Sequence, residues 1–149
     1  MVHRFSSLVL FAALPLAAQT VTAEHGLTPE IQVTANDYAF TPLPANIHHG
    51  ATLFSFVNNG KVRHELSIGR LKSTASVEQF LKMDAGPERA ALIDRSVGIL
   101  IAGPGKSPDG KLLVDLRKGA TYIVYCNLVD KPGAPAHLSM GMYTSFVPK

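Results

Sequence analysis

The sequence predicts an all-β protein, a Greek-key β-sandwich of short strands with a small helical insertion. Short runs of alternating apolar and polar residues recur along the chain, as in strands with one buried face, and turn-forming Gly, Pro and Asn residues separate them. Apolar residues at helical spacing are confined to a stretch near the middle. A length of 149 residues suits one domain with one hydrophobic core.

The strands expected in the first half rest on alternation followed by turn signals. Residues 31–35 alternate apolar and polar side chains until Asn36-Asp37 breaks the run. ATLFSFV, residues 51–57, is rich in residues that favour strands, and the turn Asn58-Asn59-Gly60 ends it. A third short strand is expected at residues 64–68.

The helical insertion is expected between two groups of strands. Apolar residues at helical spacing predict a helix over residues 74–83, which Pro87 limits. A second short helix is predicted over residues 88–95, and the insertion as a whole is taken to span residues 71–109.

Three further strands are expected after the insertion. Residues 111–116 alternate, Gly119 marks a turn, and TYIVYCN at 121–127 is the strongest strand signal in the chain. Residues 142–147 form the last expected strand.

The N-terminus has the layout of a secretory signal peptide. His3 and Arg4 precede an apolar run at residues 8–18 that is too short to span a bilayer. A small-residue stretch follows, so we expect cleavage after Ala23, a signal peptide at 1–23 and a mature domain at 24–149. The alternative is an uncleaved anchor. The expected location is the periplasm or the exterior.

Charge excludes some classes of partner. The chain has 14 Lys and Arg and 11 Asp and Glu residues, a net charge of +3, without a run of five or more like charges. Basic nucleic-acid arms and membrane-binding patches need such runs, so neither partner is expected. We expect a monomer, with no stable membrane insertion after cleavage.

The single cysteine, Cys126, cannot form an internal disulfide. In an exported protein three interpretations remain: a buried inert thiol, an intermolecular disulfide, or a metal ligand.

The residues around Cys126 favour the metal ligand. Cys126 ends the strongest strand, a loop follows, and His137 and Met142 lie where the next strand begins. His64, after the Asn58-Asn59-Gly60 turn, is the candidate fourth ligand. Two imidazoles, one thiolate and a weak axial thioether form the donor set typical of blue copper sites, whereas zinc favours more cysteines or a third nitrogen or oxygen ligand. Strand alternation would give Met140 and Met142 the same facing, so it does not decide between them.

The mature chain resembles the cupredoxin family of plastocyanin- and azurin-like proteins. The motifs NNGKVRHE (58–65), KGATYIVYC (118–126) and HLSMGM (137–142) follow the family's order, and the last is especially similar to pseudoazurin. The resemblance implies one type 1 copper bound by four side chains, with Met142 rather than Met140 as the axial ligand. Three features depart from the family pattern. Ten residues, 127–136, separate Cys126 from His137, Glu65 stands where Asn is common, and the helical insertion at 71–109 is larger than in the smallest electron carriers. The implied ligands are His64, Cys126, His137 and Met142.

The expected function is therefore electron transfer between redox partner proteins by a type 1 copper protein. A copper carrier or chaperone that delivers the ion, and a cupredoxin-like domain that has lost its metal, are the alternatives. We expect no enzyme, because the sequence offers no third group to complete a thiol-based catalytic site and too few histidines for further copper centres.

Overall fold

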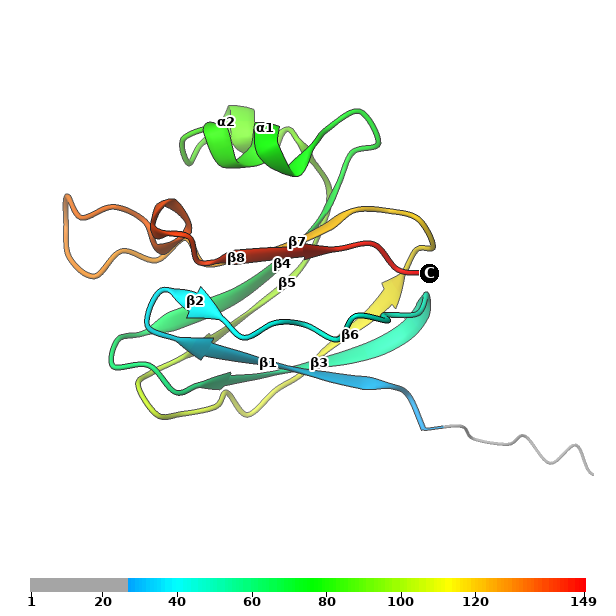
Figure 1. The fold of residues 1–149 in the computed structure, drawn as a ribbon. Helices are drawn as coiled ribbons and strands as arrows, with labels where there is room; N and C mark the ends of the chain where they lie inside the picture. Colours follow the sequence, from blue (N-terminus) through cyan, green and yellow to red (C-terminus); the bar gives the residue numbers. More distant parts are fainter. Residues whose placement is uncertain (1–26) are drawn as a thin grey trace, which may run out of the picture.

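The computed structural model describes residues 27–149 and shows two four-stranded sheets packed face to face (Figure 1). All neighbouring strands run antiparallel except β1 and β3, which are parallel. The predicted all-β sandwich is confirmed, whereas the signal peptide at 1–23 lies outside the described residues and stays a prediction. The first sheet contains, in spatial order, β2 (Ala39–Phe40), β1 (Glu30–Asn36), β3 (Gly50–Asn58) and β6 (Leu112–Leu116). The second contains β5 (Ile93–Ala102), β4 (His64–Leu71), β7 (Tyr122–Tyr125) and β8 (Tyr143–Phe146).

The core lies between the two sheets. Alternate residues of β1 and β3 point inward, and they meet inward-facing residues of the second sheet, which gives the period-2 burial expected for a sandwich. Burying these side chains stabilises the fold by about 1.5–3 kcal/mol each. Among the completely buried ones are Val33, Phe54, Leu66 and Val124.

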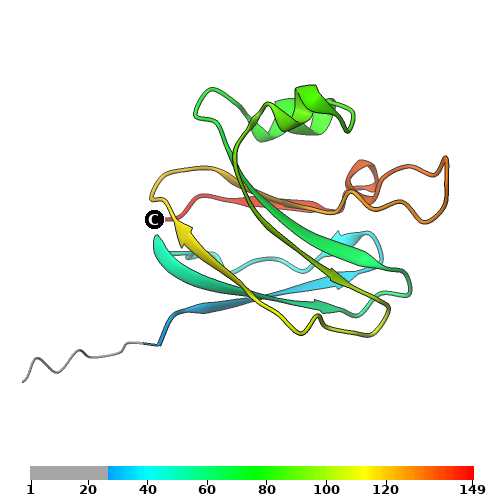
Figure 2. The ribbon, with the colours of Figure 1, turned by 180° about the vertical axis from the view of Figure 1, so that it is seen from behind.

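The helical insertion covers the outer face of the second sheet. Figures 1 and 2 show α1 (Val77–Lys82) and α2 (Pro87–Ala90) on the side of that sheet away from the first sheet. Ser76 begins α1 with a capping box shared with Gln79. Phe80 of α1 packs into a second apolar cluster with Ile123 of β7, so the central strands β4 and β7 are buried on both faces.

The extent of the insertion was predicted wrongly. Residues 88–95 do not form one helix: α2 ends at Ala90, and the ten-residue strand β5 begins at Ile93. β5 pairs with β4 from Leu71↔Ile93 to His64↔Ala102, although the register shifts at two places. The sequence of β5 does not alternate between apolar and polar residues, because its outer side carries the apolar residues Ile99 and Ile101. These two side chains are 55% and 48% exposed.

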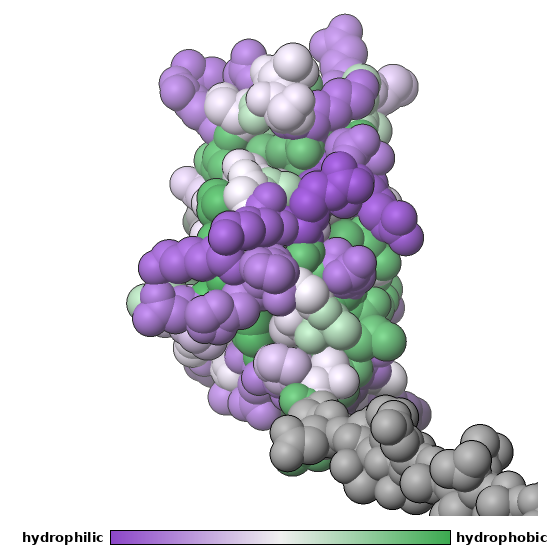
Figure 3. Space-filling model, turned by 90° about the vertical axis from the view of Figure 1, so that its right-hand side faces the viewer, coloured by the Kyte–Doolittle hydropathy of each residue, from purple (hydrophilic) through white to green (hydrophobic). Residues whose placement is uncertain are grey.

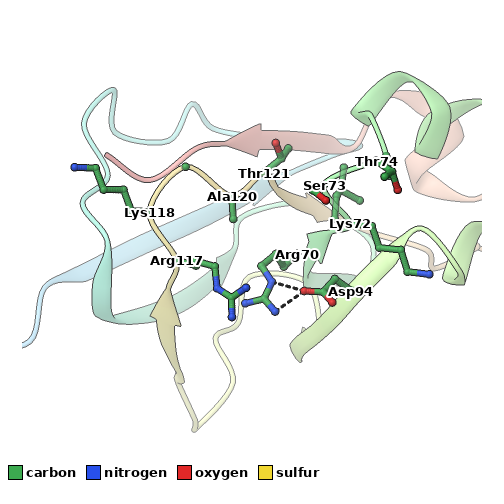
Figure 4. A pocket seen from close by; sticks show the side chains of 12 residues that line it. Arg70, Lys72, Ser73, Thr74, Asp94, Arg117, Lys118, Ala120 and Thr121 are labelled. Carbon is green, nitrogen blue, oxygen red and sulfur yellow. Dashed lines mark hydrogen bonds and ion pairs between the residues drawn. The ribbon is translucent and has the colours of Figure 1, made fainter.

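The two ends of the sandwich differ in chemistry. One end carries the loop after β7 and the start of β4. The other end, seen in Figure 3, is crossed by hydrophilic side chains. A cavity of about 670 Å³ near that end is lined by Arg70, which is paired with Asp94, and by Arg117, among others (Figure 4). In the described part of the chain, no helix is long and apolar enough to cross a membrane.

Candidate metal centre

Three of the predicted ligands meet at the end of the sandwich where β4 begins. The Nδ1 atoms of His64 and His137 lie 3.0 Å apart, and the Sγ atom of Cys126 lies 3.3 Å from Nδ1 of His137. The possible ligand atoms of all three residues lie within 4.8 Å of one another, and all three residues are completely buried. The sequence predicted that a strand end, a loop and a strand start would gather Cys126, His137 and Met142, with His64 from a neighbouring strand. The structure brings His64, Cys126 and His137 of this set together.

The turn before β4 fixes the position of His64. Asn58 is completely buried, and its amide donates to the carbonyls of Val62, Ala102 and Gly103 at 2.8–3.0 Å. Its Oδ1 accepts from Gly60 N–H at 2.9 Å. A Cβ atom at position 60 would lie only 2.7 Å from Asp37 Oδ1 and 3.0 Å from His64 Nε2, so any side chain there would have to displace its neighbours.

The environment of His64 keeps its imidazole neutral. Burial first, and then the neighbouring His137, lowers the pKa of His64. Its Nε2 is buried and has no hydrogen-bond partner among the described residues. A neutral imidazole can bind a metal ion through a ring nitrogen that carries no proton.

Cys126 follows directly after β7, where its thiol points into the cluster. Its backbone N–H donates to the carbonyl of Met142 at 3.2 Å, and the N–H of Glu65 donates to Sγ at 3.3 Å. Burial raises the pKa of the Cys126 thiol to about 11. The metal-free thiol therefore keeps its proton at neutral pH, and binding of a metal ion would release that proton.

The structure separates the two methionines that the sequence left equivalent. Met140 ends a 3₁₀-helix, η1 (His137–Met140), and Gly141 follows at φ +100°. This left-handed residue reverses the chain, and Met142 N–H then donates to the carbonyl of His137 at 3.0 Å. Met142 is completely buried while Met140 is 38% exposed. The expectation of equal facing is wrong, because these residues do not lie on one strand: β8 begins at Tyr143.

The long loop at residues 127–136 is tied to the cluster. His137 N–H donates to the carbonyl of Leu128 at 2.9 Å, and His137 Nε2–H donates to Asp130 Oδ1 at 3.0 Å. The hydroxyl of Tyr38 donates to Asp130 Oδ2 at 2.6 Å. The hydrogen bonds from Tyr38 and from His137 lower the pKa of Asp130. Sequence reasoning did not identify Asp130 or Tyr38, since no local pattern links residues so far apart in the chain.

A chain of polar contacts joins the helical insertion to the strand end that carries Cys126. Glu65 is 7% exposed, and its Oε1 accepts from Asn127 N–H at 2.8 Å and from Ser67 Oγ at 3.1 Å. Arg89 of α2 donates to Asn127 Oδ1 at 2.7 Å and lies over the ring of Phe80. The insertion therefore fixes the residue that directly follows the thiol.

The cluster fits a small, soft metal ion. Ligands bound to one ion at about 2.0–2.3 Å in a trigonal arrangement lie about 3.5–4 Å apart. The separations of 3.0 and 3.3 Å therefore need to widen by less than about 1 Å. The carboxylate of Asp130 bonds to the outer nitrogen of His137 rather than to the cluster. Two imidazoles and one thiolate favour copper over the hard cations that carboxylates bind.

Comparison with known proteins establishes the fold. No family model and no curated protein matches the sequence. An auracyanin from Roseiflexus castenholzii is 17% identical, with a TM-score of 0.53, over 83% of this chain and 99% of that one. Auracyanin B is 16% identical, with a TM-score of 0.55, over 83% of this chain and 92% of that one. Auracyanin A from Chloroflexus aurantiacus is described as a "blue" copper protein. It is 18% identical, with a TM-score of 0.50, over 80% of this chain and 98% of that one.

At such identities the likeness shows a shared fold, so the predicted cupredoxin-like sandwich is confirmed. What this chain binds has to be argued from its own residues.

Proposed function

We propose that this protein is an exported type 1 copper protein that carries single electrons between redox partner proteins. One copper ion would be held by His64, Cys126, His137 and Met142. The observation that carries the proposal is the buried convergence of two imidazole Nδ1 atoms and one thiol sulfur. When bound, copper supplies a centre that takes up and gives back one electron.

The donor set suits both oxidation states of copper. A thiolate donates strongly to Cu(II), whereas a thioether favours Cu(I), so the mixed set changes little on electron transfer. Burial supports Met142 over Met140 as the thioether, since a solvent-exposed side chain cannot complete a buried site.

The rigidity of the cluster favours electron transfer over copper delivery. A delivery protein gains from an exposed or mobile ligand, but His64, Cys126 and His137 are all completely buried. The loop before His137 is fixed through Leu128 and Asp130. A site held in this way needs little reorganisation when its charge changes, which fast electron transfer requires.

The same burial supports a carrier rather than an enzyme, because a substrate has no open position beside the ligands. Auracyanin A, of the same fold, is described as a "blue" copper protein. Export rests on the N-terminal sequence pattern, and a monomer that meets its redox partners transiently is part of the proposal.

The test separates carrier from delivery protein. The copper form is cycled between an oxidant and a reductant in the presence of a strong Cu(I) chelator, and bound copper is measured after each cycle. A carrier keeps its copper through repeated cycles, whereas Cys126→Ser, the matched control, loses it early. Release of copper from the parent protein on the first reduction would favour delivery and overturn the proposal.

A further inference from the structure

We propose that Asp130, held by Tyr38, is a positioning residue that fixes the tautomer of His137, shields its outer nitrogen and lowers the reduction potential of copper at this site. The claim about the potential rests on the proposed function. The claim about the tautomer concerns the metal-free protein and stands independently.

The tautomer follows from the groups on either side of the His137 ring. The Asp130 carboxylate accepts hydrogen bonds only, and its Oδ1 lies 3.0 Å from Nε2, so the ring proton is on Nε2. A neutral imidazole carries one proton, and its lone pair is then on Nδ1. That atom points to Nδ1 of His64 and to Sγ of Cys126. Asp130 therefore prepares His137 as a ligand before a metal ion arrives.

Tyr38 keeps Asp130 in place from the other sheet. Its hydroxyl donates to Asp130 Oδ2 at 2.6 Å, and its ring meets those of His137 and His64 edge-on, with centroids 5.0 and 6.1 Å away. Tyr38 lies in the turn between β1 and β2 with φ +58°, a conformation uncommon for residues other than glycine. The preceding Asp37 accepts from Lys61 N–H at 2.6 Å, which anchors this turn to the loop before His64.

Together these contacts close the end of the sandwich over His137. The His137 side chain is only 1% exposed, whereas that of Asp130 is 34% exposed. A partner that approaches this end meets the loop at residues 127–136 and the Asp130 carboxylate instead of the imidazole edge.

The carboxylate has an electronic effect as well as a geometric one. A hydrogen bond from a ligand imidazole to a carboxylate makes the imidazole a stronger donor. A stronger donor and a nearby negative charge both favour Cu(II) over Cu(I), so the reduction potential falls. Asparagine at position 130 keeps an oxygen that accepts from Nε2–H of His137 but removes the negative charge. This substitution therefore separates the geometric effect of Asp130 from its electronic effect.

The experiment uses Asp130→Asn, Asp130→Ala and Tyr38→Phe in the mature chain. Asp115→Asn is the control, because it removes the same charge from an exposed position on β6 near the opposite end. The tautomer of His137 is read by nitrogen NMR of the metal-free proteins. The reduction potential and the rate of copper loss to a chelator are measured on the copper forms.

We expect the Nε2–H tautomer in the parent and in Asp130→Asn, and a mixture of tautomers in Asp130→Ala. Asp130→Asn should shift the equilibrium between Cu(II) and Cu(I) toward Cu(I) by at least about tenfold, which raises the reduction potential by about 59 mV for one electron. Asp115→Asn should leave the reduction potential unchanged. Asp130→Ala should also lose copper to the chelator faster than the parent protein. Tyr38→Phe should raise the reduction potential and the rate of copper loss by smaller amounts.

Two results would overturn the inference: the Nδ1–H tautomer in the parent protein, or a potential in Asp130→Asn equal to that of Asp115→Asn. A chain that binds no copper would overturn the proposed function and the claim about the potential together. The NMR result would then still decide whether Asp130 positions His137.

Discussion

The imidazoles of His64 and His137 face each other with their Nδ1 atoms 3.0 Å apart, although 73 residues separate them in the chain. The pairing of β4 with β7 brings this about, since antiparallel neighbours place the start of β4 beside the end of β7. The segment after β7 then returns as η1 and delivers His137 to the same point. A turn positions His64, the end of β7 positions Cys126, and η1 positions His137, so each can be tested separately.

Glu65→Gln tests the buried carboxylate beside the thiol. Glutamine keeps an oxygen for Asn127 N–H and removes the negative charge close to Cys126, so we expect a higher reduction potential with little change in stability. Glu65→Ala also leaves Asn127 N–H without its partner, at a cost of about 1–3 kcal/mol in the free energy of unfolding. Glu88→Gln on the exposed face of α2 is the control. If Glu65→Gln and Glu88→Gln have the same potential, the buried charge does not act on the metal.

Arg89→Ala tests the link between the helical insertion and the strand end at Asn127. The substitution removes donors to Asn127 Oδ1 and to the carbonyl of Met83, and the packing on Phe80. We expect a loss of about 2–4 kcal/mol in urea unfolding of the metal-free protein, because the hydrogen bonds are charged and partly buried. Lys82→Ala, on the exposed side of α1, should change stability by less than about 0.5 kcal/mol. An equal effect of the two substitutions would show that the insertion does not brace the site.

Met142→Leu and Met140→Leu test the axial ligand. Leucine fills a similar volume, so the folded state should lose less than about 1.5 kcal/mol in either variant. Removal of the buried thioether should raise the reduction potential and change the visible spectrum of the Cu(II) form. Replacement of the exposed Met140 should leave both unchanged. The reverse pattern would assign the axial role to Met140.

The pH dependence of the metal-free chain tests the burial of Cys126. Burial raises the pKa of its thiol from a usual value of 9.0 to about 11. Between these values the unfolded thiol has lost its proton and the folded thiol has not, so the folded state binds more protons. The free energy of unfolding therefore falls as the pH rises through this window and is unaffected below it. Urea unfolding at several pH values should show a shallower decline for Cys126→Ser, and equal slopes would contradict a raised pKa.

Local patterns in the sequence were sufficient to predict most strands and three residues of the cluster. Each of His64, Cys126 and His137 follows a turn or ends a strong strand, and such signals are local. The facing of Met142 was not predictable in this way, because it depends on the left-handed conformation of Gly141. β5 escaped prediction because apolar residues on its exposed side obscure the alternation. Asp130 and Tyr38 meet only through the fold, across 92 residues.

The most direct test of copper binding is the visible and electron-spin-resonance spectrum of the purified mature chain with one equivalent of Cu(II). We predict the intense thiolate-to-copper absorption that makes such proteins blue or green, and its complete loss in Cys126→Ser, since the chain has no other cysteine. A nearly colourless Cu(II) complex with nitrogen and oxygen ligands only, unchanged in Cys126→Ser, would contradict the proposed site.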